Sequence, residues 1–483
     1  MATTQGLKGR KKFNVGINGL CFAASLDARE APPLSEVPGF ARCFKQCNRR
    51  ILAALLCRLV LETPYVPGPS QVPKPRHTWR FYKRQHERQH ERQPASYFYN
   101  MNMLVFLIAF AVSLSVTLLV IHFSKTHGHL SMDTDLSGPQ KFHAHPVPRV
   151  GGVGIVCALV AATAAAWWVD SSVGKSAMLL LVCSAPAFLA GLIEDLTKRV
   201  SPAKRLLATA VSAALAAWLL DALIRRADIP GLDLLVATTA GAAVVTIFAV
   251  AGIANSVNII DGFNGLASMC VVLMLASLAY VGFQVGDTLV STLALAGIGA
   301  VLGFFIWNFP TGLIFLGDGG AYFLGFYVAE VAILLLVRNP SVSPLFPLLV
   351  CIYPVFETLF SIYRRRFLRQ VPPSMPDGIH LHSLVYRRML SWAVGNRSAK
   401  ALTRRNSMTS PYLWLLCMLS IVPAVLWWNN SAVMALFLVL FALTYVALYW
   451  RIVRFKSPRW LLLPAARASR LPQPDADEQH RLP

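Results

Sequence analysis

The stretch from Ala254 to Met269, written ANSVNIIDGFNGLASM, decides how the rest of this chain is interpreted. Four polar residues occur in it at every third position: Asn255, Asn258, Asp261 and Asn264. On a helix, residues three apart share a face, with a drift of about 60° per step. An acid and three amides on one face indicate a binding or catalytic site, although Asn, Gly and Asp are also ordinary loop residues.

Long apolar runs flank this stretch and continue along most of the chain. Of the 483 residues, 55% are hydrophobic and 14% are charged, and the mean hydropathy is +0.52. Soluble proteins carry about 25% charged residues, so this composition predicts an all-α polytopic integral membrane protein. We expect about eleven transmembrane helices of roughly 20 residues. They are placed near residues 103–123, 150–169, 176–193, 205–224, 233–253, 265–283, 288–307, 320–337, 344–363, 411–428 and 431–450.

The charged residues are mostly basic, and the net charge is +22. Lys and Arg lie in short connections between the apolar runs and at both ends of the chain. This is the pattern that anionic lipids and the positive-inside rule produce, so we expect membrane lipids as partners and no nucleic acid. The connections richest in Lys and Arg are assigned to the cytoplasm. The stretch from Ala254 to Met269 falls on the same side.

The first hundred residues differ from the rest of the chain. They contain no spanning run and carry 17 Lys and Arg against 6 Asp and Glu. We interpret residues 1–100 as a basic, disordered extension. The topology favours a biological start at Met101 or Met103, because a long basic arm would otherwise have to cross the membrane. A membrane-embedded domain at 101–455 and a cytoplasmic tail at 456–483 complete the expected organisation.

Four further polar segments fall on the cytoplasmic side, and the first is KFHAHPVPRVGGVG at 141–154. Arg149 can bind a phosphate with its forked guanidinium group. Gly151 and Gly152 can let backbone amides approach a ligand closely. The alternative is an ordinary loop that enters a helix and is anchored by an arginine.

The second segment is GLIEDLTKRVSPAKR at 191–205, which ends an apolar run with two acids, Glu194 and Asp195. Acids at the edge of a membrane need a cation, water or another partner. One interpretation is that this pair accepts a proton or supports a metal. The other is an ion pair with Lys198 at the membrane surface.

The third segment is NFPTGLIFLGDGGAY at 308–322, in which Asp318 is the lone acid. The neighbouring Gly317, Gly319 and Gly320 predict room for a bulky anion beside the backbone. A carboxylate without an evident partner at this depth is a candidate functional group. The alternative is an aspartate that caps the following helix.

The fourth segment is PPSMPDGIHLHSLVYRR at 372–388, with His380 and His382 two residues apart. Both can donate hydrogen bonds to phosphate, and solvated loop histidines are the alternative. Together the five polar stretches supply carboxylate and amide oxygens, which Mg²⁺ prefers beside substrate phosphates. They also supply cations that can neutralise a reacting diphosphate.

The chain resembles the polyprenyl-phosphate N-acetylhexosamine-1-phosphate transferases of glycosyltransferase family 4. Five motifs carry the resemblance in the order seen in that family: PVPRVGG at 146–152, GLIEDLTKR at 191–199, NSVNIIDGFNGL at 255–266, GDGG at 317–320 and HLH at 380–382. The resemblance covers about residues 103–450. It implies a multi-pass enzyme (EC 2.7.8 class) in the bacterial inner membrane with its active site facing the cytoplasm. It further implies sugar-1-phosphate transfer from a UDP-N-acetylhexosamine to undecaprenyl phosphate, with Mg²⁺ or Mn²⁺ and release of UMP.

The resemblance also assigns roles to individual residues. Asp318 and Asn258 would hold the metal. The catalytic group would comprise Asp195, Glu194, Asp261, His380 and His382. Groups that bind the substrate would be Asn255, Asn264, Arg149, Gly151, Gly152, Lys198 and Gly262.

Within the family, the motifs are similar to the branch that starts O-antigen, enterobacterial common antigen or teichoic acid chains. The peptidoglycan translocase branch typically has three consecutive histidines and a PTMGG loop, where this chain has HLHS and PVPRVGG. Glu194 replaces the Asp of many members, and Ser383 replaces a further His. A membrane transporter or lipid carrier is the competing class, and a homodimer is left open.

Overall fold

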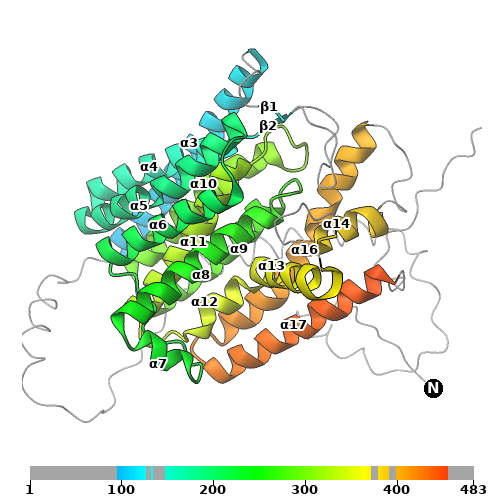
Figure 1. Cartoon of the computed structure of the whole chain (residues 1–483). Coiled ribbons are helices and arrows are strands. Elements are labelled where there is room, and N and C mark those ends of the chain that lie inside the picture. Colours follow the sequence, from blue (N-terminus) through cyan, green and yellow to red (C-terminus); the bar gives the residue numbers. More distant parts are fainter. Residues whose placement is uncertain (1–94, 127–131, 134–146, 371–378, 391–398, 455–483) are drawn as a thin grey trace, which may run out of the picture. The chain divides into compact units, whose positions relative to one another are not determined.

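The computed structural model describes residues 95–126, 132–133, 147–370, 379–390 and 399–454, and this part of the chain is helical almost throughout (Figure 1). Most of the expected extension and the tail from residue 456 lie outside the described residues, so both remain predictions. The long helices are α3 (Ala95–Thr126), α4 (Gly151–Val169), α5 (Ser171–Thr197), α6 (Pro202–Leu219), α8 (Thr239–Ile260), α9 (Leu266–Val285), α10 (Thr288–Asn308), α11 (Gly317–Arg338), α16 (Ala399–Leu426) and α17 (Ser431–Val453).

Shorter elements connect these helices. They are the helices α7 (Leu232–Val236), α12 (Leu345–Val350), α13 (Ile352–Tyr363) and α14 (Leu381–Leu384), the π-helical segments η2 (Arg364–Arg369) and η3 (Val385–Met389), and the antiparallel strands β1 (Met132–Asp133) and β2 (Val147–Pro148).

The expectation of an all-α polytopic membrane protein is confirmed. Nine described helices are long and apolar enough to cross a membrane: α3, α4, α5, α8, α9, α10, α11, α16 and α17. Two of the expected spans are not among these nine helices. The segment at 205–224 contributes to α6, a helix of 18 residues. The segment at 344–363 is divided at Cys351 into α12 and α13. Each of these short helices contains a proline, Pro347 or Pro354, which removes a backbone donor.

Polar residues between the apolar runs cap the N-termini of five of the ten long helices. Asp170 accepts from the backbone amides of Ser172 and Val173 and so caps α5. Ser201, Thr238, Asp287 and Asn430 cap α6, α8, α10 and α17 in the same way. Such caps satisfy amides that the first helical turn leaves without a partner. The residue before α11, Leu316, has no side chain that can do so.

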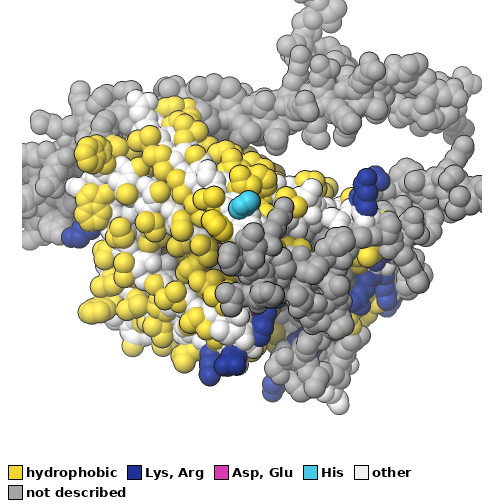
Figure 2. Space-filling view, turned by 90° about the horizontal axis from the view of Figure 1, so that it is seen from above, with side chains coloured by type: hydrophobic (Ala, Val, Ile, Leu, Met, Phe, Trp, Pro, Cys, Tyr) yellow, Lys and Arg dark blue, Asp and Glu magenta, His cyan; other side chains and the backbone are white. Residues whose placement is uncertain are grey.

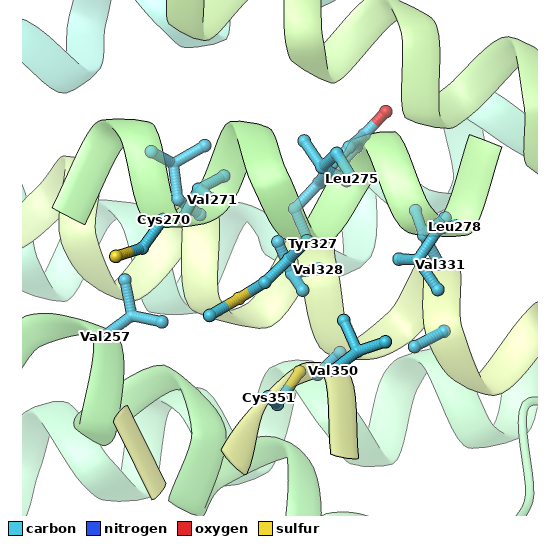
Figure 3. Close-up of a cluster of buried hydrophobic side chains, with 14 of the residues drawn as sticks. Val257, Cys270, Val271, Leu275, Leu278, Tyr327, Val328, Val331, Val350 and Cys351 are labelled. Atoms are coloured by element: carbon cyan, nitrogen blue, oxygen red, sulfur yellow. The ribbon is translucent and has the colours of Figure 1, made fainter. Parts of the chain in front are cut away.

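Helix α11 lies at the centre of the described helices and is buried along almost its whole length. It contacts α4, α5, α6, α8, α9, α10 and α12. Figure 3 shows part of this core, where Val257 of α8, Leu275 of α9, Val331 of α11 and Val350 of α12 converge. Apolar packing on every side accounts for an apolar sequence without a polar face, which is typical of a central helix.

The outer faces of the bundle are apolar as well. In Figure 2, hydrophobic side chains cover most of the described surface on the side shown, and Lys and Arg gather near its margins. Trp168, Trp218 and Phe248 are each more than three-quarters exposed. An apolar surface of this extent suits contact with lipid chains.

The close crossing of α4 and α11 can be tested at Gly152. A Cβ atom there would lie 2.4 Å from Cα of Gly320, so the backbones would have to move apart. We expect Gly152→Ala to lower the free energy of unfolding by about 1–3 kcal/mol and to lower the thermal unfolding midpoint in detergent. Gly252→Ala is the matched control, because nothing lies within 4 Å of its added Cβ. An unchanged midpoint for Gly152→Ala would contradict the crossing.

Candidate functional site

The first turn of α11 is capped by an acid from another helix. Asp195, in the last turn of α5, is 3% exposed. Its Oδ1 accepts from the backbone amide of Asp318 at 3.0 Å, and its Oδ2 accepts from that of Gly319 at 2.9 Å. An anion at a helix N-terminus is stabilised by these free amides and by the helix dipole. Asp195 therefore ties the end of α5 to the start of α11.

Glycines make this approach possible. A Cβ at Gly191 of α5 would lie 2.5 Å from Cα of Gly319, and one at Gly317 would lie 2.6 Å from Oδ2 of Asp195. Gly317 also has a positive φ of 77°, which favours glycine. The predicted room for a bulky anion beside Gly317 and Gly319 is therefore wrong: α5 and Asp195 fill that space.

The two glycines that follow Arg149 also pack against the α10–α11 connection. The backbone amide of Gly151 donates to the carbonyl of Phe315, and that of Gly152 donates to the carbonyl of Leu316, both at 3.0 Å. Both amides already have acceptors within the fold. The structure thus gives Gly151 and Gly152 a packing contact, where the sequence suggested amides directed at a ligand.

Asp318 is the meeting point of three cationic or amide side chains from different parts of the chain. Nη2 of Arg149, just before α4, lies 3.4 Å from its Oδ1. Nδ2 of Asn258, near the end of α8, donates to the same oxygen at 3.0 Å. The guanidinium of Arg205, in the first turn of α6, forms an ion pair with Oδ2. Four segments far apart in sequence therefore converge on one carboxylate.

A tyrosine continues this cluster along α11. The hydroxyl of Tyr322 donates to Oδ1 of Asn255 at 3.0 Å. The guanidinium carbon of Arg205 lies 5.7 Å from the centre of the Tyr322 ring, within range of a cation–π contact. Asn255 and Asn258 thus face α11 from adjacent turns of α8, as their spacing of three predicted.

The two adjacent acids have different surroundings. Asp195 is buried against α11, whereas Glu194 is half-buried and its Oε2 accepts from the backbone amide of Val200 at 2.7 Å. Glu194 therefore stabilises the loop that follows α5. Lys198 lies in this loop, and its positive charge acts on Asp195.

Asp261 ends α8 and begins the loop that connects it to α9. The side chain is half-buried, and desolvation raises its pKa to about 7. The positive charge of Arg149 acts in the opposite direction, and the negative charge of Asp195 adds to the rise. These electrostatic interactions link Asp261 to the cluster around Asp318.

The histidine motif lies against the next residues of the same loop. The ring of His382 meets that of Phe263 edge to face, with centres 5.5 Å apart. Its Nε2 lies 3.9 Å from the position of a Cβ added to Gly262. His380 stacks on His382 with ring centres 5.1 Å apart, and its Nδ1 lies 2.9 Å from Oε1 of Glu357. The structure thus brings both predicted histidines to the Asp261 loop.

Asn264 contacts helix α16. Its Nδ2 donates to the carbonyl of Pro310 at 3.3 Å and to Oγ of Ser407 at 3.1 Å. Its backbone amide donates to Oδ1 of Asn406 at 2.8 Å, and Oγ of Ser410 donates to its carbonyl at 2.6 Å. These contacts give the buried Asn264 a role in holding the loop to α16.

The donor set around Asp318 fits a hard divalent cation. Among the described residues, no group of three or more His, Cys, Asp or Glu side chains could hold a metal ion. Mg²⁺, however, is usually bound by one or two carboxylates together with substrate phosphates and water. Asp318 and Asn258 touch each other and carry oxygen ligands of the kind that Mg²⁺ prefers. They can contribute to one cation site when a diphosphate supplies further oxygens.

Several residues of the site carried no clear signal in the sequence. Arg205 looked like one of many basic loop residues, and Glu357 lay inside an apolar run. The polar residues at the start of α16 looked like a loop before a spanning helix. Each acquires its partner from a distant segment, so its local sequence could not reveal it.

Comparison with known proteins places these groups in a family context. Residues 177–336 match the family model described as Glycosyl transferase family 4, and the matched range contains Asp195, Asn258, Asp261 and Asp318. The chain is 27% identical over 300 residues to the probable undecaprenyl-phosphate N-acetylglucosaminyl 1-phosphate transferase of Bacillus subtilis (strain 168). That alignment covers 61% of this chain and 80% of the relative.

Two further relatives are similar to parts of the chain. The undecaprenyl-phosphate alpha-N-acetylglucosaminyl 1-phosphate transferase of Thermotoga maritima is 27% identical over 264 residues, which are 53% of this chain and 74% of that protein. A phospho-N-acetylmuramoyl-pentapeptide-transferase of Clostridium botulinum is 40% identical over 108 residues, which are 22% of this chain and 32% of that protein.

The cap that Asp195 provides can be tested by Asp195→Asn. An amide offers one acceptor oxygen where the carboxylate offers two, so one buried backbone amide of α11 loses its partner. We expect the free energy of unfolding to fall by about 1–3 kcal/mol, measured as a lower thermal midpoint in detergent. Glu194→Gln is the neighbouring control and should cost less, because Glu194 accepts from a single amide in a loop. Equal effects of the two variants would argue against the cap.

Proposed function

The chain belongs to glycosyl transferase family 4, and from this we propose that it transfers a sugar-1-phosphate from a UDP-sugar to undecaprenyl phosphate and releases UMP. The observation that carries the proposal is the convergence of Arg149, Arg205 and Asn258 on Asp318. Two guanidinium groups beside an acid at the end of a membrane helix suit a diphosphate that is bound with a divalent cation.

In the proposed reaction, an oxygen of the acceptor phosphate forms a bond to the phosphorus that carries the sugar. The bond from that phosphorus to UMP breaks, and UMP leaves with the electron pair. Arg149 and Arg205 would bind phosphate oxygens as negative charge moves onto the leaving group. A Mg²⁺ held by Asp318 and Asn258 would neutralise charge on the diphosphate.

The remaining predicted residues have supporting roles in this proposal. Asp195 holds the first turn of α11, and therefore Asp318, in place. Asp261 would act through its charge on the nucleotide sugar or on the acceptor phosphate. The next residue of its loop, Gly262, is exposed. His382 contacts the same loop through Phe263, and His380 stacks on His382. Both rings, when protonated, would donate to the diphosphate.

We also propose that α6 crosses the membrane. Arg205 at the start of α6 contacts Asp318 at the start of α11. After α6, Nη2 of Arg226 donates to the carbonyls of Asn339 at 3.2 Å and Val342 at 2.6 Å, beyond the other end of α11. The segment from Arg205 to Arg226 therefore extends along the whole of a helix that is long enough to span the bilayer.

The same argument supports a crossing by α12 and α13 together. Before α12, the amide of Ser343 donates to the carbonyl of Trp428, just after α16. In the middle of α13, Glu357 contacts His380 beside the site. Both crossings restore the expected eleven spans. By the positive-inside rule, the end that carries the site then faces the cytoplasm.

The proposed sugar is N-acetylglucosamine, in keeping with the names of the two relatives that align over most of their length. The histidine motif HLHS supports a role in starting a cell-surface polysaccharide such as O-antigen. A transporter is the weaker alternative, because the acids and cations of the site gather at one end of the helices.

The direct test uses the purified full chain in nanodiscs with UDP-N-acetylglucosamine and undecaprenyl phosphate. We expect release of UMP and formation of a lipid-linked sugar only when Mg²⁺ or Mn²⁺ is present. Asp318→Asn should reduce turnover by at least about 100-fold, because it removes the carboxylate proposed to hold the cation that neutralises the diphosphate. Asp221→Asn is the control, since Asp221 is exposed and pairs with Arg225 away from the site. Near-normal turnover of Asp318→Asn would refute the assignment of Asp318.

The raised pKa of Asp261 predicts a pH dependence. Burial raises this pKa to about 7, so the carboxyl group is protonated below that pH and ionised above it. If the ionised group acts on substrate, kcat/KM rises between about pH 6 and pH 8, since this ratio reports groups of the free enzyme. Asp261→Asn cannot ionise, so its residual activity should lose this rise. A rise of the same size in the variant would assign it to another group.

A further inference from the structure

A buried acid outside the predicted motifs holds the histidine segment. Glu357 lies on α13 and is 1% exposed. Its Oε1 lies 2.9 Å from Nδ1 of His380 and accepts from the backbone amide of Leu381 at 3.1 Å. Its Oε2 accepts from the hydroxyl of Tyr445 at 2.7 Å. The carboxylate therefore faces three hydrogen-bonding groups, of which the amide and hydroxyl are donors to it.

These contacts define how the His380 ring is presented. A carboxylate can only accept hydrogen bonds, so the nitrogen that faces Glu357 carries the proton. The other nitrogen, Nε2, is then directed away from Glu357. The ring also stacks on His382, with planes 10° apart, and His382 touches the Asp261 loop through Phe263. His380 is thus connected to the Asp261 loop through the ring of His382.

Residues of η2 and α17 hold the residue that precedes His380. Nη1 of Arg364 donates to the carbonyl of Ile379 at 2.5 Å, and the hydroxyl of Tyr449 donates to that carbonyl at 3.4 Å. The Phe360 ring packs on the rings of Tyr445 and Tyr449, with centres 5.6 and 4.8 Å apart. The residue before His380 and the acid that faces it are therefore held by α17 together with α13 and the π-helical segment η2 that follows α13.

We propose that Glu357 is a positioning residue for the transfer reaction and that Tyr445 orients Glu357. Glu357 holds a proton on Nδ1 of His380 and keeps the ring in register with His382, so that Nε2 of His380, when it is protonated as well, can donate to the diphosphate. Acids that fix the tautomer and orientation of a functional histidine act in this way in other sites. The inference rests on the proposed function, because that function supplies the diphosphate.

The kinetic test compares Glu357→Gln, His380→Ala and the double variant in nanodiscs of the full chain. We expect Glu357→Gln to lower kcat on the order of 10- to 100-fold and to change KM for the UDP-sugar much less. In the His380→Ala background the same change should cost less than about twofold, because its effect acts through His380. A cost that is equal in both backgrounds would overturn the proposal.

A second variant separates positioning from folding. Tyr445→Phe removes one hydroxyl that donates to Glu357 and keeps the aromatic packing, so it should lower kcat several-fold with an unchanged thermal midpoint. If Glu357→Gln does not fold, Tyr445→Phe in the His380 and His380→Ala backgrounds carries the same test. A normal kcat for Tyr445→Phe would then overturn the proposal.

A spectroscopic measurement tests the orientation without turnover. In protein labelled with ¹⁵N in its histidine rings, the signal that is lost in His380→Ala should show a proton on Nδ1, and Glu357→Gln should shift it. A His380 signal with a proton on Nε2 and none on Nδ1 would overturn the proposal. A wild-type chain that shows the expected signal but releases no UMP would instead count against the proposed function.

Discussion

The carboxylate of Asp195 at the first turn of α11 is the interaction on which the rest of the site depends. A buried charge is costly unless it is paired and hydrogen-bonded. Here two backbone amides of α11 donate hydrogen bonds to the carboxylate. Helix α11 has no capping side chain of its own. The contact requires that α5 and α11 approach at Gly191 and Gly319. Burial of the acid, capping of the helix and the glycine crossing are therefore parts of one arrangement, and it determines where Asp318 lies.

Asp318 in turn organises the charges at this end of the bundle. Its two oxygens are shared by Arg149, Arg205 and Asn258, which belong to the starts of α4 and α6 and the end of α8. A diphosphate with its cation would compete for these same partners. In the proposed complex, the charges of the substrate and its cation would replace these internal contacts.

The Asp261 loop joins this cluster to the second half of the site. Its first residue is coupled electrostatically to Arg149 and Asp195. Its middle contacts His382, and Asn264 at its end is tied to α16. The histidines are supported in turn by Glu357 and Tyr445. Helices α13, α16 and α17 thus support this loop, directly or through the histidines. The loop's acid, Asp261, interacts electrostatically with Arg149 before α4 and Asp195 of α5.

Hydropathy and loop charge are local properties, so the helical membrane architecture and the positions of the polar motifs could be predicted from the amino-acid sequence. The spacing of Asn255 and Asn258 correctly predicted a shared helix face. Only the tertiary structure separated Asp195 from Glu194, directed Asn264 to α16 and filled the space beside Gly317. It also divided the segment at 344–363 and brought Arg205 and Glu357 into the site. These outcomes depend on which distant backbone and side-chain groups satisfy each buried polar atom, and such pairing is decided by packing between helices.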